Sequence, residues 1–411
     1  MPPSPCTCCI RKHSLHPALA PGVRSRQRRS FSSLLLSLFD PGNKHSSRPR
    51  TLLTLFLSLS LTPTLVLSQN PSLYTPRYSS GSAVVNKTFY LVGGTTAIVW
   101  PISATGDVLS VSLENPFTAD AVPWIERTAS TVPVADARVA ATKDKSHLVL
   151  VGMNSTATPL AVTYDISLDQ WALPLGGTPN LTLSPRTSVG IVTDTNTGLL
   201  VMYGGLIPGT KLSLELDILN PDSSSANQWT WLAPTNETMM LALYEPMMFY
   251  LSGIQSVLVL GGCDGYDPKL NLLGCAALSK GYLINTGPQA SPISSGTPST
   301  VVLNSKEATM PMARLSPCNT LLPNGDVLIH GGVTFGYTES LNDTWLLSTK
   351  TWTWTQVSLQ NAPTQGRAGA ACELVAPNLV MVVGGKWLGS YFACHLNVCF
   401  LDSCPDEPFI I

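Results

Sequence analysis

The feature that most constrains this chain is an internal repeat. A run of aliphatic or β-branched residues ending in two glycines occurs five times: at Gly93-Gly94, Gly204-Gly205, Gly261-Gly262, Gly331-Gly332 and Gly384-Gly385. A sixth copy, at Gly152-Met153, keeps only the first glycine. Successive first glycines are 59, 52, 57, 70 and 53 residues apart. A loose period of this length indicates that stacked copies of one small unit make up the chain.

Each copy of the repeat has similar surroundings. In five of the six copies an arginine lies 14 to 18 residues before the glycines: Arg77, Arg138, Arg186, Arg314 and Arg367. The other copy has Tyr244-Glu245-Pro246 at that place. An apolar run and a turn separate the arginine from the glycines, and a polar loop, a further apolar run and, in most copies, a tryptophan follow. Short apolar runs bounded by turn residues predict strands that are buried on both faces.

Such a unit predicts one four-stranded antiparallel sheet for each copy. A sheet that must bury both faces needs a neighbour on each side, so the copies are expected to stack around a ring. We therefore predict an all-β fold, a β-propeller of six four-stranded blades, with seven blades as the alternative. The glycine pairs are expected where the backbone passes close to a neighbour. The recurring arginines are expected to serve the blades by binding loop carbonyls or a nearby carboxylate.

The repeat resembles the kelch repeat from Arg77 to about Asp402. The match is closest from Arg314 through VLIHGG and LNDTWLLST to Trp354. The resemblance implies one blade for each copy and a ring closed by strands from the two chain ends, with Gln69–Thr75 or Pro408–Ile411 as the closing strand. The longest spacing contains QASPISSGTPST, which we interpret as an insertion in the fourth blade. Together with the leader described next, the chain is similar to exported fungal kelch proteins labelled galactose oxidase-like.

The first 68 residues differ from the rest of the chain. They contain nine Lys or Arg but only one acidic residue, Asp40. We predict a basic, Ser/Pro-rich disordered segment over residues 1–50 and a secretory signal peptide over residues 51–68, cleaved after Ser68. An uncleaved signal anchor, giving a type II membrane protein, is the alternative. Residues 69–411 are then expected to form a single kelch propeller that is secreted or held at the cell surface.

The remaining chain is acidic, with 15 basic and 24 acidic residues. This balance gives no reason to expect a nucleic acid or an anionic lipid as a partner. A membrane enters the prediction only if residues 51–68 remain as an anchor. Charged residues make up only 12% of the chain, which suits sheets that are buried on both faces.

Seven cysteines follow the leader, and in an exported protein some of them should pair. Cys263 and Cys275 would close a local loop, and two of Cys394, Cys399 and Cys404 could close the C-terminal end. For Cys318 and Cys372, buried small hydrophobic residues are at least as good an interpretation. Five N-glycosylation sequons are compatible with export: Asn86, Asn154, Asn180, Asn236 and Asn342.

No catalytic motif stands out in the sequence, and we predict no catalytic residue, metal or other cofactor. The galactose oxidase resemblance would require two His and two Tyr around one copper, but the body of the chain contains only His147, His330 and His395. We therefore predict a non-catalytic propeller that binds an unknown protein or glycan at the cell surface or wall. Loop aromatics are candidate ligand contacts: Trp100, Tyr266 and Trp387. A secreted copper oxidoreductase is the alternative.

Overall fold

The computed structural model describes residues 74–96, 104–118, 121–130, 133–153, 159–172, 186–207, 211–221, 230–232, 241–267, 271–286, 298–335, 338–363, 365–386 and 397–401. These residues form β-strands and loops, including a short 3-10 turn at Ser252–Ile254, with no α-helix among them. Among the same residues, none forms a helix long and apolar enough to span a membrane. The predicted leader, residues 1–68, lies outside this part of the chain.

The first three large sheets follow one another along the sequence. Sheet 1 contains β1 (Gly81–Val85), β2 (Thr88–Val92), β3 (Val108–Ser112) and β4 (Ile125–Arg127). Sheet 2 contains β5 (Ala135–Ala141), β6 (His147–Met153), β7 (Pro159–Asp165) and β8 (Gln170–Ala172). Sheet 3 contains β9 (Gly190–Thr193), β10 (Leu200–Tyr203), β13 (Leu216–Asn220) and β14 (Thr230–Leu232). A small ribbon of β11 (Leu206–Ile207) and β12 (Lys211–Leu212) accompanies sheet 3.

The other three sheets follow in the same order. Sheet 4 contains β15 (Met247–Leu251), β16 (Ser256–Leu260), β19 (Lys280–Asn285) and β20 (Ser299–Val302), with a ribbon of β17 (Cys263–Asp267) and β18 (Asn271–Cys275). Sheet 5 contains β22 (Cys318–Leu321), β23 (Val327–His330), β24 (Thr344–Ser348), β25 (Thr353–Val357) and β21 (Asn304–Ser305). Sheet 6 contains β27 (Ala368–Ala376), β28 (Leu379–Lys386), β29 (Asn397–Leu401) and β26 (Leu359–Gln360).

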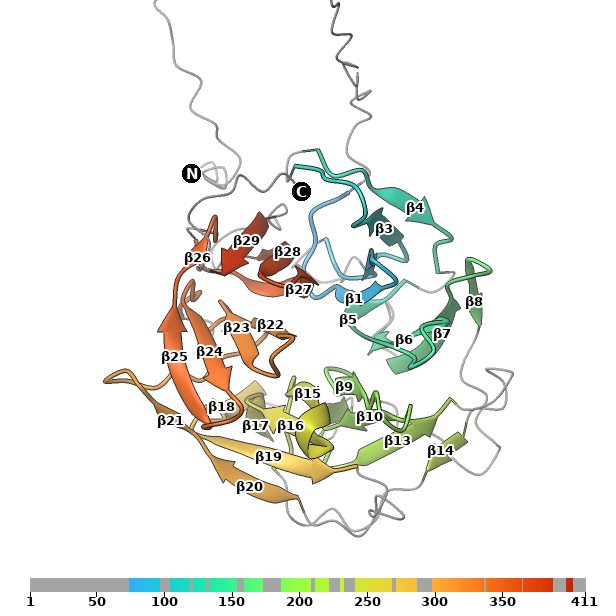
Figure 1. The fold of residues 1–411 in the computed structure, drawn as a ribbon. Helices are drawn as coiled ribbons and strands as arrows, with labels where there is room; N and C mark the ends of the chain where they lie inside the picture. Colours follow the sequence, from blue (N-terminus) through green and yellow to red (C-terminus); the bar gives the residue numbers. More distant parts are fainter. Residues whose placement is uncertain are drawn as a thin grey trace, which may run out of the picture. The chain divides into compact units, whose positions relative to one another are not determined.

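These sheets form a β-propeller. The first strands of neighbouring sheets contact one another in the order β1, β5, β9, β15, β22 and β27, and β27 contacts β1 again. Figure 1 shows the sheets arranged around a common centre. The all-β prediction is therefore confirmed, as is the propeller arrangement. The predicted number of four-stranded blades is wrong: five sheets have four strands, and sheet 5 has a fifth, β21, which pairs in parallel with β25.

The hydrophobic core lies between the sheets. One cluster of buried side chains fills each contact between neighbouring sheets, for example Phe89, Leu109, Trp124 and Met381 between sheets 1 and 6. All five residues of β16 are buried, as expected for a strand covered on both faces. This packing explains why short apolar runs recur throughout the chain.

The glycine pairs lie where one sheet meets the next. Gly93 and Gly94 both have positive φ, and the Gly94 N–H donates to the carbonyl of Val134 at 2.7 Å. A Cβ on Gly93 would lie 2.6 Å from the same carbonyl oxygen. Glycine is needed here because both the left-handed backbone and the close approach of sheet 2 exclude a side chain.

The four described strands of sheet 6 all come from one stretch of the chain, residues 359–401. The outermost strand of sheet 6, β26, comes directly before β27 in sequence and pairs with β29. Both closing strands considered from the sequence lie almost wholly outside the described residues, apart from Tyr74 and Thr75.

Candidate functional site

Six equivalent residues surround the centre of the propeller, one at the start of each inner strand. All six have a left-handed backbone, with φ between 46° and 68°, and we call them the channel ring: Ser79, Asp136, Ser188, Glu245, Ser316 and Gly369. Most residues with a side chain avoid this conformation, so its recurrence in six sheets reflects one shared turn. The turn brings these residues close to the axis around which the sheets are arranged.

Backbone hydrogen bonds connect the channel ring from sheet to sheet. The Ser79 N–H donates to the Gly369 carbonyl at 2.7 Å, and the Gly369 N–H donates to the Ser316 carbonyl at 2.8 Å. The Glu245 N–H similarly donates to the Ser188 carbonyl at 2.8 Å. Because these bonds cross sheet boundaries, they connect the inner strands to one another around the centre of the propeller.

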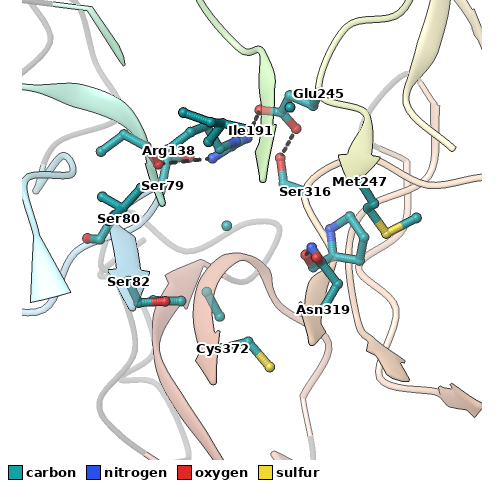
Figure 2. A pocket seen from close by; sticks show the side chains of 18 of the residues that line it. Ser79, Ser80, Ser82, Arg138, Ile191, Glu245, Met247, Ser316, Asn319 and Cys372 are labelled. Carbon is teal, nitrogen blue, oxygen red and sulfur yellow. Dashed lines mark hydrogen bonds and ion pairs between the residues drawn. The ribbon is translucent and has the colours of Figure 1, made fainter. Parts of the chain in front are cut away.

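Side chains of the channel ring form a charged network with Arg138 of β5. Arg138 Nη2 lies 3.3 Å from Asp136 Oδ1 and 3.1 Å from Glu245 Oε1. The hydroxyl of Ser188 donates to Asp136, and the hydroxyl of Ser316 donates to Glu245. Figure 2 shows Arg138 directed toward Glu245, with Ser316 on the other side of that carboxylate. The network thus connects sheets 2, 3, 4 and 5.

Burial and the neighbouring charges shift the pKa values of Glu245 and Arg138 in opposite directions. Burial raises the pKa of Glu245, and the nearby Arg138 and the Ser316 hydroxyl only partly offset this effect. Burial alone would lower the pKa of Arg138, but the carboxylates of Asp136 and Glu245 raise it. Arg138 therefore stays charged. Its guanidinium is the positive charge that faces the carboxyl groups of both Asp136 and Glu245.

The channel ring borders a polar cavity of about 160 Å³, the central cavity. All six inner strands or the turns before them contribute to its wall. Its polar side chains come mainly from hydroxyl, amide and carboxyl groups, including Ser80, Ser82, Asn319 and Glu373. Figure 2 shows Ser82, Asn319 and Cys372 around the same opening as Arg138.

Glu373 of β27 is the carboxyl group of the cavity wall that lies apart from the charged network. It accepts a hydrogen bond from the Ser82 hydroxyl of β1 at 2.9 Å. Burial raises the pKa of Glu373 to about 7, because the hydrogen bond from Ser82 lowers it less than desolvation raises it. Glu373 therefore changes charge near neutral pH.

Four of the five repeated arginines serve the loops of their own sheets: Arg77, Arg186, Arg314 and Arg367 are each 1% exposed. Arg314, for example, donates to the carbonyl of Gly331 at 2.9 Å and pairs with Asp343 at 2.6 Å. Arg138 is different. It lies two residues beyond the channel ring position of sheet 2, and its side chain lines the cavity. Val134 occupies the place that corresponds to the other four arginines, and its carbonyl accepts from Gly94.

The two histidines in the described part of the chain, His147 and His330, lie in different sheets. His330 of β23 is fully buried, and its Nδ1 lies 2.9 Å from the Thr344 hydroxyl. His147 lies on β6 in another sheet, where its Nε2 is 3.5 Å from Asp165 Oδ2. His395 lies outside the described residues. Within the described part of the chain, no three His, Cys, Asp or Glu side chains are grouped to hold a metal ion.

The predicted ligand-contact loops fall largely outside the described residues. Trp100 and Trp387 lie outside them, and for Tyr266 only the backbone, in β17, is described. Two of the five sequons can be placed: Asn86 is exposed in the turn between β1 and β2, and Asn342 is exposed just before β24. Asn154, Asn180 and Asn236 lie outside the described residues.

The described residues contain two disulfides. Cys263 and Cys275 join β17 to β18, as the sequence suggested. Cys318 and Cys372 form a second disulfide, between the inner strands of sheets 5 and 6. The interpretation of Cys318 and Cys372 as unpaired hydrophobic residues is therefore wrong: the ring brings together two strands that are 54 residues apart in sequence. For Cys394, Cys399 and Cys404 no side chain is described.

The central cavity, and the places of Arg138, Glu245 and Glu373 in its wall, were not predicted from the sequence. A signal for the channel ring is nevertheless visible, since a small residue follows four of the repeated arginines at the second position: Ser79, Ser188, Ser316 and Gly369. Glu245 takes the equivalent position in the copy that has no arginine. A comparison with protein-family models and with curated proteins finds no match to this sequence.

Proposed function

We propose that this protein is an exported, non-catalytic kelch-type propeller that binds a protein or glycan at the cell surface or wall. In this proposal all six large sheets are blades, and the fifth strand of sheet 5 is an addition to one of them. The buried arginine that binds a loop carboxylate, together with the glycine pair at the next sheet, supports the kelch assignment. The two disulfides are consistent with an oxidising compartment.

The observation that carries the proposal is the polar central cavity. An apolar cavity of about 150 Å³ in another protein accommodates benzene, so this cavity of about 160 Å³ has room for one six-membered ring or one side chain. Its wall offers hydroxyl, amide and carboxyl groups, which recognise polar groups by hydrogen bonding. The partner is therefore expected to place one polar unit in the cavity, while its remaining surface contacts the surrounding loops.

The test is binding of the full-length protein to a glycan array and to an array of secreted and cell-surface proteins. Glu373→Gln and Ser82→Ala change two groups of the cavity wall, and Glu307→Gln on an exposed loop is the matched control. We expect a bound partner whose affinity falls at least tenfold in both cavity variants but not in the control. Either the absence of a partner on both arrays or equal binding by folded cavity variants would overturn the proposal.

Export and catalysis have tests of their own. N-terminal sequencing of the protein from the culture medium should begin at Gln69, whereas an uncleaved anchor would keep the protein in the membrane fraction. Stoichiometric copper in the purified protein, together with substrate-dependent peroxide production, would replace the binding proposal by the oxidoreductase alternative.

A further inference from the structure

The charges of the central cavity are unevenly matched. Three of the residues that line it are charged or titratable: Arg138, Glu245 and Glu373. Arg138 lies 3.1 Å from Glu245 and 3.3 Å from Asp136, so its guanidinium already has two acidic partners. Within the described residues no cation pairs with Glu373, whose carboxylate accepts only from the Ser82 hydroxyl. An ionised Glu373 is thus an uncompensated negative charge on the cavity wall.

The strands around Glu373 supply no hidden cation among the described residues. Facing strands β1 and β22 contribute the neutral side chains of Ser82 and Asn319 to the cavity. On β28, Lys386 lies over the Tyr78 ring, with its Nζ 5.9 Å from the ring centroid, and Lys386 does not line the cavity. Across the cavity the charged groups are Arg138 and Glu245, which bind each other.

We propose that the central cavity binds a primary ammonium group, with Glu373 as its counter-ion and the Ser82 hydroxyl beside it. The inference rests on the proposed binding function and names the chemistry of the group that enters the cavity. An ammonium has three N–H donors and no acceptor, so it needs a site rich in acceptors. Asn319 Nδ2 donates to the Pro317 carbonyl at 3.0 Å, which leaves the Asn319 Oδ1 as a further acceptor in the wall.

Charge complementarity distinguishes this ligand from the other polar groups that would fit. An anion would meet the uncompensated carboxylate of Glu373, and Arg138 is already bound by two acids. A neutral hydroxyl would leave the ionised Glu373 without a counter-charge at a half-buried place on the cavity wall, which is unfavourable. An ammonium supplies both the charge and the hydrogen-bond donors, and charge-assisted hydrogen bonds are stronger than neutral ones.

Binding should be linked to the ionisation of Glu373. Since burial raises the pKa of Glu373 to about 7, the carboxyl is mostly protonated at pH 6 and mostly ionised at pH 8. An alkylammonium stays charged over this range. The ligand must therefore displace the Glu373 proton at low pH, and its affinity should be about tenfold weaker at pH 6 than at pH 8.

The experiment is titration calorimetry of the full-length protein with n-butylammonium, and with 1-pentanol as a neutral ligand of similar size. We expect one butylammonium site, about tenfold weaker binding at pH 6 than at pH 8, and no measurable pentanol binding. Glu373→Gln should weaken butylammonium binding at least tenfold and remove its pH dependence, whereas Glu307→Gln should change neither. Circular dichroism spectra of both variants check that they are folded.

The outcomes separate the ligand chemistry from the proposed function. If butylammonium does not bind, or binds equally to Glu373→Gln, the ammonium inference is wrong, although cavity-dependent binding on the arrays would still support the proposed function. A parallel titration distinguishes two sources of the ammonium. Tighter binding of a lysine-containing peptide than of spermidine points to a protein partner, and the reverse order points to a free polyamine.

Discussion

Arg138 Nη2 lies 3.1 Å from Glu245 Oε1, and this ion pair joins sheets 2 and 4, which are not neighbours in the ring. Sheet 3 lies between them, and its Ser188 donates a hydrogen bond to Asp136, the other acidic partner of Arg138. One guanidinium therefore compensates two acids contributed by two sheets. Asp136 and Glu245 thus share one cation, Arg138.

Replacing Arg138 should destabilise the whole ring. Arg138→Met keeps much of the side-chain volume but leaves Asp136 and Glu245 buried without a cation, at a cost of about 3 kcal/mol in the free energy of unfolding. Urea denaturation at pH 8 measures this loss. The loss should be smaller at pH 5, because burial raises the pKa of Glu245 and its carboxyl group can take up a proton instead. Adding Glu245→Gln to Arg138→Met should restore part of the stability, and a further loss would contradict the assigned charge balance.

Glu373 should make the protein less stable as the pH rises. The pKa of Glu373 is raised from 4.5 to about 7 in the folded state. The folded protein therefore holds a proton that the unfolded chain releases, and this stabilisation is full below pH 4.5 and is lost as the pH rises to about 7. We expect the stability difference between wild type and Glu373→Gln to fall over this interval by about 1.4 kcal/mol for each pH unit at most. Denaturation curves across the interval provide the test, and a constant difference would show that the Glu373 pKa is not raised.

His330 should have the opposite effect. Burial, together with the positive charge of Arg367, lowers the pKa of His330 from 6.5 to about 4. The unfolded chain binds a proton that the folded protein rejects, so stability is lost as the pH falls from 6.5 toward 4. His330→Leu, which places in sheet 5 the residue found at Leu260 in sheet 4, should remove this acid sensitivity. Thermal denaturation at pH 4.5 and 7 should show a smaller difference for His330→Leu than for wild type, and an equal difference would contradict a neutral buried His330.

The two disulfides should differ in their effect on stability. The chain between Cys318 and Cys372 is longer than that between Cys263 and Cys275, with separations of 54 and 12 residues. A disulfide stabilises a protein by constraining its unfolded chain, and more so for a longer loop. Replacing both cysteines by serine should therefore lower the free energy of unfolding by about 4 kcal/mol for Cys318/Cys372 and by about 3 kcal/mol for Cys263/Cys275. Denaturation of the two double variants without reductant measures both losses. A larger loss for the Cys263/Cys275 variant would show that native contacts, and not chain entropy, dominate.

The repeat predicted much of the fold because its signals are local. Paired glycines such as Gly93-Gly94 and apolar runs such as β16 report the conformation and burial of their own segments. The number of strands in each sheet was less predictable, since β21 joins sheet 5 from the segment that follows sheet 4. Arg138 shows a similar limit: its spacing from Gly152 places it with the other arginines, yet Val134 takes their structural position.

The amino-acid sequence by itself determined that this protein is an all-β propeller, because each copy of the repeat encodes strands that cannot bury both faces alone. Only the tertiary structure decided which side chains meet at its centre. The Cys318–Cys372 disulfide, the Arg138–Glu245 pair and the Ser82–Glu373 hydrogen bond join residues 54, 107 and 291 positions apart. No local pattern records such contacts. They form because closing the ring brings all six inner strands to one axis, where buried charges must find partners from other sheets.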